Sequence, residues 1–154
     1  MYSSGNSYIL SYIVQKLEGK TCRELVQERV GKEIGLNDFP WMLSPEGVCS
    51  GGNGVSLTTE DMLRIGLLYL NKGKWNGKQL LSEKWIEEST RASDVDYYAY
   101  LFWRGEYNSY RADGKYSQLS IILPDKDAVI SLVSECRRGE ELQRAVYDLI
   151  CSKL

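Results

Sequence analysis

The chain contains no histidine. Histidine is the general base of Ser-His-Asp and Cys-His enzymes and the commonest metal-ligating side chain, so its absence excludes both of these catalytic arrangements. Acid–base chemistry in this chain must therefore rely on tyrosine, lysine or carboxylate side chains.

Cysteine is scarce and shows no pattern. Cys22, Cys49, Cys136 and Cys151 are widely spaced and include no Cys-x-x-Cys pair. A zinc site is therefore not expected, and the cysteines are interpreted as buried thiols. Three disulfide pairings are possible for four cysteines, and the spacing does not choose among them. We predict that the chain uses no metal and no cofactor.

Long apolar runs and an excess of one charge are also missing. Runs such as Ile121-Ile122-Leu123 are far shorter than the ~20 residues that span a bilayer. The first residues have no basic start and no apolar signal core, so any export signal or anchor is expected upstream of Met1. The net charge of −2 gives no reason to expect nucleic acid or an anionic membrane as a partner.

The 154 residues that are present have the composition of one ordinary globular domain. Apolar residues share one helical face over residues 6–17, so this helix is expected to pack on the core. The capping-box spacing of Thr21 and Glu24 predicts a second helix that ends near Gly35. A third helix, 60–71, is apolar nearly all round and is expected to be deeply buried.

A long structured loop is expected between the second and third helices, over residues 37–56, because proline and glycine interrupt any periodicity there. Its glycine-rich part, residues 51–54, lacks the spacing and the Lys-Ser/Thr ending of a phosphate-binding loop. Nucleotide binding is therefore not expected.

The second part of the chain favours strands. Strands are predicted over 97–103, 118–123 and 128–133, with a turn at 124–127, and an amphipathic helix over 140–153 is expected to pack across the sheet. The sequence thus predicts an α+β fold in a single domain, 1–154. A helical part, 1–92, comes first, and a three-stranded antiparallel sheet with a C-terminal helix follows over 93–154.

One motif carries possible chemistry. Tyr2-Ser3-Ser4-Gly5-Asn6 leads directly into the first predicted helix. It resembles the Tyr-x-Asn element of the serine β-lactamase and penicillin-binding-protein superfamily, in which a tyrosine phenol relays the proton of the nucleophile. The resemblance to the class C-like branch continues through four further segments, which are Gly19-Lys20, 47–57, 68–78 and 119–133.

The resemblance implies a catalytic role for Tyr2 and substrate-binding roles for several other residues. Ser4 stands where the family often has an asparagine that contacts a substrate amide, and Asn6 either replaces that amide or begins the helix. The family's Lys/His-Thr/Ser-Gly strand aligns with Ala112-Asp113-Gly114, in which only the glycine matches. Gln118 follows in a Gly-x-x-x-Gln pattern, with Ser117 in the place of a glycine.

The family's nucleophile is absent, because no serine in the chain has lysine three positions later. The opening strands and the Ser-x-x-Lys helix of the family are therefore expected on a missing N-terminal segment of the same domain, which would be the partner of this chain. Two functions follow from the resemblance. The full protein would be a serine hydrolase acting on a small-molecule or peptide substrate, or the chain would be a non-enzymatic module that binds a cell-wall peptide or small ligand.

Overall fold

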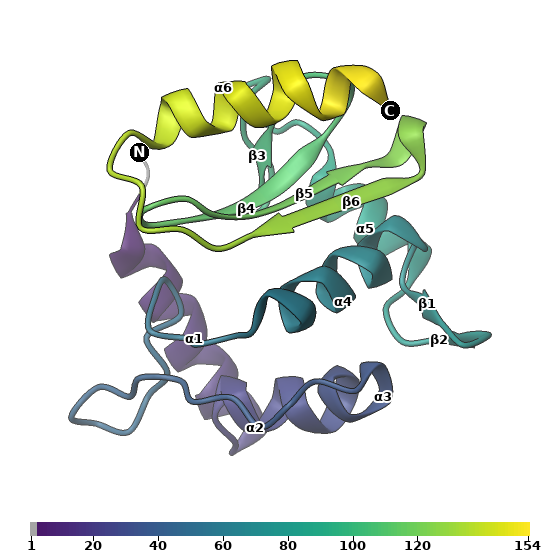
Figure 1. Cartoon of the computed structure of the whole chain (residues 1–154). Helices are drawn as coiled ribbons and strands as arrows, with labels where there is room; N and C mark the ends of the chain where they lie inside the picture. Colours follow the sequence, from purple (N-terminus) through teal and green to yellow (C-terminus); the bar gives the residue numbers. More distant parts are fainter. Residues whose placement is uncertain (1–2) are drawn as a thin grey trace. The chain divides into compact units, whose positions relative to one another are not determined.

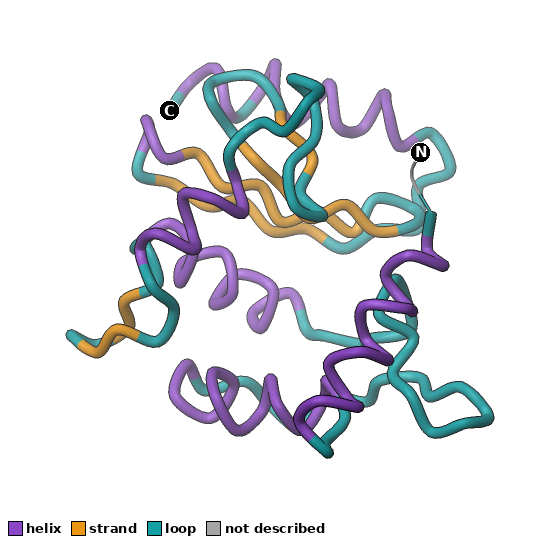
Figure 2. The backbone as a smooth tube through the Cα atoms, turned by 180° about the vertical axis from the view of Figure 1, so that it is seen from behind, coloured by secondary structure: helices purple, strands orange, loops and turns teal. Residues whose placement is uncertain are grey.

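The computed structural model describes residues 3–154, which form two compact units that meet between Asp61 and Met62 in the sequence. Figures 1 and 2 show the helices and strands of both units. Among the described residues, no helix is long and apolar enough to cross a membrane.

The first unit begins with helix α1, Ser4–Glu18, which is capped by Ser3 and ends at Gly19 in the left-handed conformation. Helix α2, Cys22–Val26, starts with the predicted capping box of Thr21 and Glu24. It continues through the π-helical turn η1, Gln27–Gly31, into α3, Lys32–Ile34, where left-handed Gly35 ends the helix. The buried apolar side chains of this unit are Leu25, Ile34, Leu36, Phe39, Val48 and Cys49.

The apolar face of α1 is exposed, and the expectation that it packs on the core is wrong. The apolar side chains of this face have exposed fractions between 38%, for Val14, and 80%, for Leu17. Ser11 is the buried residue of the helix. Ser11 lies against the second helix, where its hydroxyl is 3.1 Å from the thiol of Cys22. Periodicity identified an apolar face but could not say whether anything covers it.

The second unit contains most of α4, Thr59–Leu70, and the short hairpin of β1, Lys74–Trp75, and β2, Lys78–Gln79. Helix α5, Glu83–Thr90, follows, and a sheet with a covering helix completes the unit. The remaining elements are β3, Trp103–Arg104; β4, Tyr110–Gly114; β5, Gln118–Leu123; η2, Pro124–Lys126; β6, Ala128–Leu132; α6, Gly139–Leu149; and η3, Cys151–Lys153.

The sheet is antiparallel and runs in the order β3-β4-β5-β6. It therefore has four strands within residues 3–154, one more than expected. The predicted strand 97–103 shrinks to Trp103–Arg104, because the backbone turns at Leu101, which has a φ of 63°. The additional strand is β4, which pairs with β5 from Tyr110↔Ile122 to Gly114↔Gln118. The α+β fold class is confirmed.

Helices lie on both sides of the sheet, as Figure 1 shows for α6 and α4. On one side, α6 and η3 bury Val146, Tyr147 and Cys151 against Leu119, Ile121 and Leu123 of β5. On the other side, the hydroxyl of Ser120 donates to the carbonyl oxygen of Met62 in α4, 3.3 Å away. The C-terminal helix thus packs across the sheet as predicted.

Helix α4 is less deeply buried than expected, because most of its apolar side chains are half-buried, but its buried residue Leu68 gives a test of the core. Leu68 is 1% exposed, so Leu68→Ala should lower the free energy of unfolding by about 2–5 kcal/mol, the usual loss for a buried leucine. Leu149→Ala in α6 makes the same change where the side chain is 62% exposed, and should alter stability by less than about 0.5 kcal/mol. Urea unfolding of both variants measures the difference. Equal losses would contradict the assignment of the core.

The end of the long loop is fixed by a buried carboxylate. Asp61 is 1% exposed and accepts hydrogen bonds from the hydroxyl of Thr58 at 2.7 Å and from the backbone N–H of Asn37 at 3.2 Å. Burial by itself would raise the pKa of Asp61, but hydrogen bonds from Thr58 and Asn37 outweigh it and hold that pKa below its usual range. The ionised carboxylate therefore ties both ends of the 37–58 segment together.

The loss of stability on replacing this carboxylate should depend on pH. Asp61→Asn should lower the free energy of unfolding near neutral pH by about 1–3 kcal/mol, because one of the two acceptor oxygens becomes an NH2 donor that cannot accept from Thr58 or Asn37. A lowered folded-state pKa contributes stability above the unfolded pKa of about 3.9, and this contribution is lost as the pH falls toward the folded pKa. Chemical unfolding of both proteins from pH 7 to pH 3 should show the gap closing in acid. A gap that widens in acid would contradict the role of the ionised form.

Candidate functional site

The predicted site residues of the first unit lie at the start of α1. The hydroxyl of Ser3 accepts from the N–H of Gly5 at 3.2 Å, and this cap begins the helix. Ser4 and Asn6 therefore stand on the first turn, where both are exposed. Tyr2, the predicted catalytic residue, lies outside the described residues.

The glycine-rich part of the long loop packs against this first turn. A Cβ atom at Gly52 would lie 3.1 Å from the Cβ of Ser4, and one at Gly51 would lie 2.4 Å from the carbonyl oxygen of Ser7. The phenol of Tyr8 also donates to the hydroxyl of Ser44 at 3.0 Å. The glycines thus let the loop backbone approach the helix that carries Ser4 and Asn6.

The predicted residues of the second unit lie in the β4–β5 hairpin. In the pairing of β4 with β5, Ala112 lies opposite Ser120 and Gly114 lies opposite Gln118. Because side chains alternate along a strand, these four residues share the face of the sheet toward α4, which Ser120 contacts. Asp113 lies on the opposite face, toward α6. The amide of Gln118 donates to the carbonyl oxygen of Ser134 at 3.0 Å, which ties the start of β5 to the segment after β6.

On the α6 face, Asp113 belongs to a polar network that sequence reasoning missed. Its carboxylate is 3.2 Å from Nε of Arg111, a side chain that is 10% exposed. With the Gln143 amide oriented so that its oxygen faces the guanidinium, that oxygen accepts from Arg111 at 2.9–3.1 Å. The carbonyl oxygen of Arg104 accepts from the same guanidinium at 3.3 Å. The buried charge of Arg111 is therefore paired and hydrogen-bonded.

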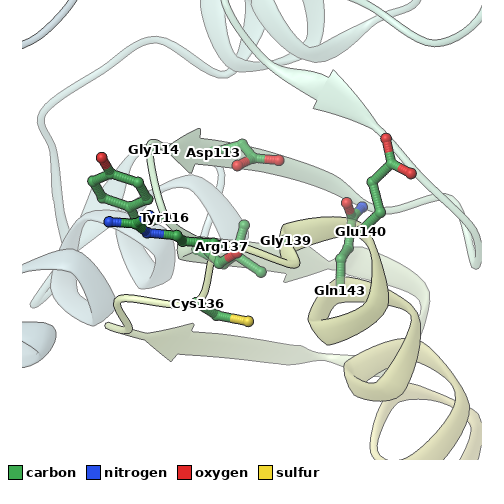
Figure 3. A pocket seen from close by; sticks show the side chains of 10 residues that line it. Asp113, Gly114, Tyr116, Cys136, Arg137, Gly139, Glu140 and Gln143 are labelled. Carbon is green, nitrogen blue, oxygen red and sulfur yellow. The ribbon is translucent and has the colours of Figure 1, made fainter.

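A pocket of about 540 Å³ opens beside this network, between the β4–β5 turn and the start of α6. Figure 3 shows its labelled side chains, with Asp113 coming from β4 and with Glu140 and Gln143 coming from α6. The full lining consists of Asp113, Gly114, Tyr116, Ser117, Leu119, Cys136, Arg137, Gly139, Glu140 and Gln143. This volume is in the range of small-molecule sites.

The structure therefore brings together part of the predicted set. Ala112, Asp113, Gly114 and Gln118 share one hairpin, while Ser4 and Asn6 belong to the other unit. Sequence reasoning missed Arg111, Gln143 and the residues around Arg137. Alternation along β4 was a signal for Arg111, because it puts Arg111 on the side of Asp113, but no sequence pattern indicated Gln143 or Arg137.

Solved structures identify the fold. No family model matches the sequence, and no curated protein is significantly similar to it. A protein from Bacillus anthracis named as a 6-aminohexanoate-dimer hydrolase matches with a TM-score of 0.85 and 25% identity, over 99% of this chain and 42% of that chain.

Two further solved structures show the same fold at lower identity. A penicillin-binding protein from Bacillus halodurans matches with a TM-score of 0.73 and 16% identity, over 97% of this chain and 56% of that chain. A protein from Bacteroides dorei named as a β-lactamase matches with a TM-score of 0.65 and 14% identity, over 92% of this chain and 55% of that chain.

The chain has a β-lactamase/penicillin-binding-protein-like fold, and the resemblance stated from the sequence motifs is confirmed. It spans 42–56% of the length of these three neighbours.

The contact between the glycine-rich loop and α1 can be tested with a matched pair of variants. Gly19 and Gly51 share a φ of 67°, but a Cβ atom at Gly19 would meet nothing within 4 Å. Alanine at either position adopts a left-handed backbone at a cost of about 1–2 kcal/mol. Only Gly51→Ala also overlaps the backbone of Ser7, which should add about 1–3 kcal/mol.

Denaturant unfolding of the two variants measures this difference. Gly51→Ala should be the less stable protein. Equal losses for Gly19→Ala and Gly51→Ala would mean that the loop does not lie against the first turns of α1.

Proposed function

We propose that this chain is a portion of a β-lactamase-related serine hydrolase, and that the full protein hydrolyses an amide, ester or β-lactam bond. The observation that carries the proposal is the match over 99% of the chain to a protein named as a hydrolase. The proposed substrate is a small molecule or peptide, held along the face of β4 and β5 that carries Ala112, Gly114 and Gln118.

The order of elements supports these roles. The first turn of α1, with Ser4 and Asn6, follows directly after Tyr2, and β4 carries Ala112-Asp113-Gly114 in an ordered hairpin. In the proposed mechanism Tyr2 takes the proton of a nucleophile and returns it to the leaving group. A phenol has a pKa of about 10, so this role needs a nearby cation that favours the phenolate. No Ser-x-x-Lys in the sequence supplies that cation or the nucleophile.

We propose that a further segment of the same domain completes the site. Within residues 3–154, β6 pairs with β5 on one side and with no strand on the other. An open edge presents unpaired N–H and C=O groups to any extended segment that can align with it. The exposed apolar face of α1 offers a second surface. This chain covers 42–56% of the three neighbours, so each neighbour contains further polypeptide with no counterpart in this chain.

The chain alone should form no acyl-enzyme with a penicillin or an activated ester, because Tyr2 cannot replace a missing nucleophile. Intact-mass spectrometry after incubation with a penicillin and with a fluorophosphonate measures this. Stoichiometric labelling of one serine in this chain would overturn the proposal that the site is incomplete.

Complementation tests the proposed function itself. A separately produced segment with opening strands and a Ser-x-x-Lys helix should bind this chain and restore hydrolysis. In the complex, Tyr2→Phe should lower turnover by about 10²–10⁴-fold, the usual range for a positioned acid or base, and should leave assembly unchanged. Turnover at the unmodified rate would remove Tyr2 from the mechanism. A folded complex that is inactive on every ester and amide tested would favour a ligand-binding module instead.

A further inference from the structure

Large apolar side chains are exposed on α5 and on the segment that joins α5 to β3. Five of them, which we call the aromatic surface, have exposed fractions between 38% and 61%: Trp85, Val95, Tyr97, Tyr100 and Leu101. All five belong to the second unit. Single exposed apolar residues are common on proteins, but a contiguous group of them marks an interaction site.

Contacts with α5 and β3 hold these side chains beside one another. The backbone N–H of Tyr100 donates to the carbonyl oxygen of Ser89 in α5 at 3.1 Å, and the rings of Tyr100 and Trp85 lie 6.2 Å apart. The ring of Tyr97 stacks on that of Trp103 at 6.4 Å. The aromatic surface therefore runs without interruption from α5 along one short hairpin.

The tip of this hairpin has a strained backbone. The N–H of Ala99 donates to the carbonyl oxygen of Phe102 at 2.9 Å, so Tyr100 and Leu101 form a two-residue loop. The φ of Leu101 is 63°, in the left-handed region, where a tight loop usually has glycine. Leucine adopts this conformation at a cost of about 1–2 kcal/mol. Because strain of this kind concentrates at binding sites, the exposed leucine favours a binding role for the tip.

The rings of the aromatic surface have faces that no cation covers. Cations of the chain lie over four other rings, those of Tyr12, Phe39, Tyr107 and Tyr116. Within residues 3–154, none lies over Trp85, Tyr97 or Tyr100. The indole N–H of Trp85 donates to the phenol oxygen of Tyr69 in α4, which fixes the orientation of the indole ring. These exposed ring faces can attract a cation from a partner.

Carboxylates border the same surface. Asp94 and Asp96 stand on either side of Val95, and Glu88 follows Trp85 by three residues, so that both side chains leave α5 on the same side. These three carboxylates are exposed and make no ion pair within the described part of the chain. Residues 83–102 contain five acidic and two basic residues, a net charge of −3. The surroundings of the rings therefore also favour a cationic partner.

The two features together select one kind of partner. Carboxylates repel an anionic membrane or a nucleic acid, and a neutral sugar would stack on the rings but leave the carboxylates unpaired. One small cation could meet only part of the surface. A segment with several cations matches both features, because lysine and arginine also bring apolar stems.

We propose that the aromatic surface binds a lysine- or arginine-rich segment of another protein. Cationic groups of the segment lie over the rings of Trp85 and Tyr100 and pair with the neighbouring carboxylates, while the apolar stems contact Leu101. None of the residues involved lines the pocket beside α6 or belongs to the β4–β5 hairpin, so this proposal does not depend on the proposed hydrolase function.

Four probes added to the full chain distinguish this partner from other classes. Acetyl-tetralysine amide carries several cations, and acetyl-lysine amide carries one. Acetyl-tetraglutamate amide reverses the charge, and chitotetraose is neutral. Two-dimensional ¹H–¹⁵N NMR follows the indole N–H of Trp85 and the backbone amides of residues 94–101, with the indole N–H of Trp75 as an internal reference.

Tetralysine should shift the signals of Trp85 and of residues 94–101 but not that of Trp75, with a Kd of about 1 mM or lower. Acetyl-lysine amide should bind at least about tenfold more weakly, and 0.5 M NaCl should weaken the binding of tetralysine, because salt screens exposed charges. Tetraglutamate should cause no shift. Equal binding of tetraglutamate, stronger binding of chitotetraose, binding of tetralysine that salt leaves unchanged, or no shift by tetralysine would each overturn the proposal.

Variants test the assigned contacts. Tyr100→Ala and Glu88→Gln should each weaken the binding of tetralysine about two- to fivefold, the range for one exposed cation–π contact or ion pair. Both side chains are exposed, so the fold should tolerate these changes. Glu87→Gln is the matched control for charge, because Glu87 lies on the same helix but on the side toward Lys72. Tyr12→Ala is the control for the ring, because Lys16 already lies over Tyr12.

Both control variants should bind tetralysine nearly as tightly as the unmodified chain does. Unchanged binding in Tyr100→Ala and Glu88→Gln, or equal losses in Glu88→Gln and Glu87→Gln, would contradict the proposed surface.

Discussion

The second unit depends on the packing of α6 against one face of the sheet. Leu119, Ile121 and Leu123 of β5 are buried against this helix, with exposed fractions no greater than 1%. Each fully buried leucine or isoleucine contributes about 1.5–3 kcal/mol, and a register shift by one residue would move all three to the other face. This packing therefore fixes which residues of β4 point each way.

The two faces of β4 consequently carry different chemistry. Ala112 and Gly114 lie with Gln118 on the face toward α4, where the proposed substrate would bind in a completed hydrolase. Arg111 and Asp113 lie toward α6, where Gln143 and the pocket are found. The register of β4 against β5 therefore decides which side chains face α4 and which face α6.

The sequence predicted the features that depend on local chemistry. The structure contains the predicted capping box at Thr21 and Glu24, the strands over 118–123 and 128–133, and the C-terminal helix. These features could be predicted because caps, alternation and helical periodicity depend on residues that are close together in the sequence. The exposed face of α1 and the break at Leu101 could not be predicted, since both depend on what surrounds the segment.

The site was predictable only in part, for a related reason. The motif resemblance selected Ala112, Asp113, Gly114 and Gln118, which the structure places in one hairpin. No spacing rule indicated that Ser117 faces Gly139, or that Gln143 binds Arg111, because these contacts join a turn or a strand to a helix that lies later in the chain. Contacts of this kind appear only once the helix has packed on the sheet.

Within residues 3–154, β5 lies inside an antiparallel sheet and the outer edge of β6 pairs with no strand. Amide hydrogen exchange of the isolated chain, followed by NMR at low concentration, tests it most directly. The account predicts slow exchange along Gln118–Leu123 and fast exchange at alternate residues of Ala128–Leu132, whose N–H groups point away from β5. Slow exchange at every residue of Ala128–Leu132 in a monomer, or fast exchange throughout Gln118–Leu123, would contradict the account.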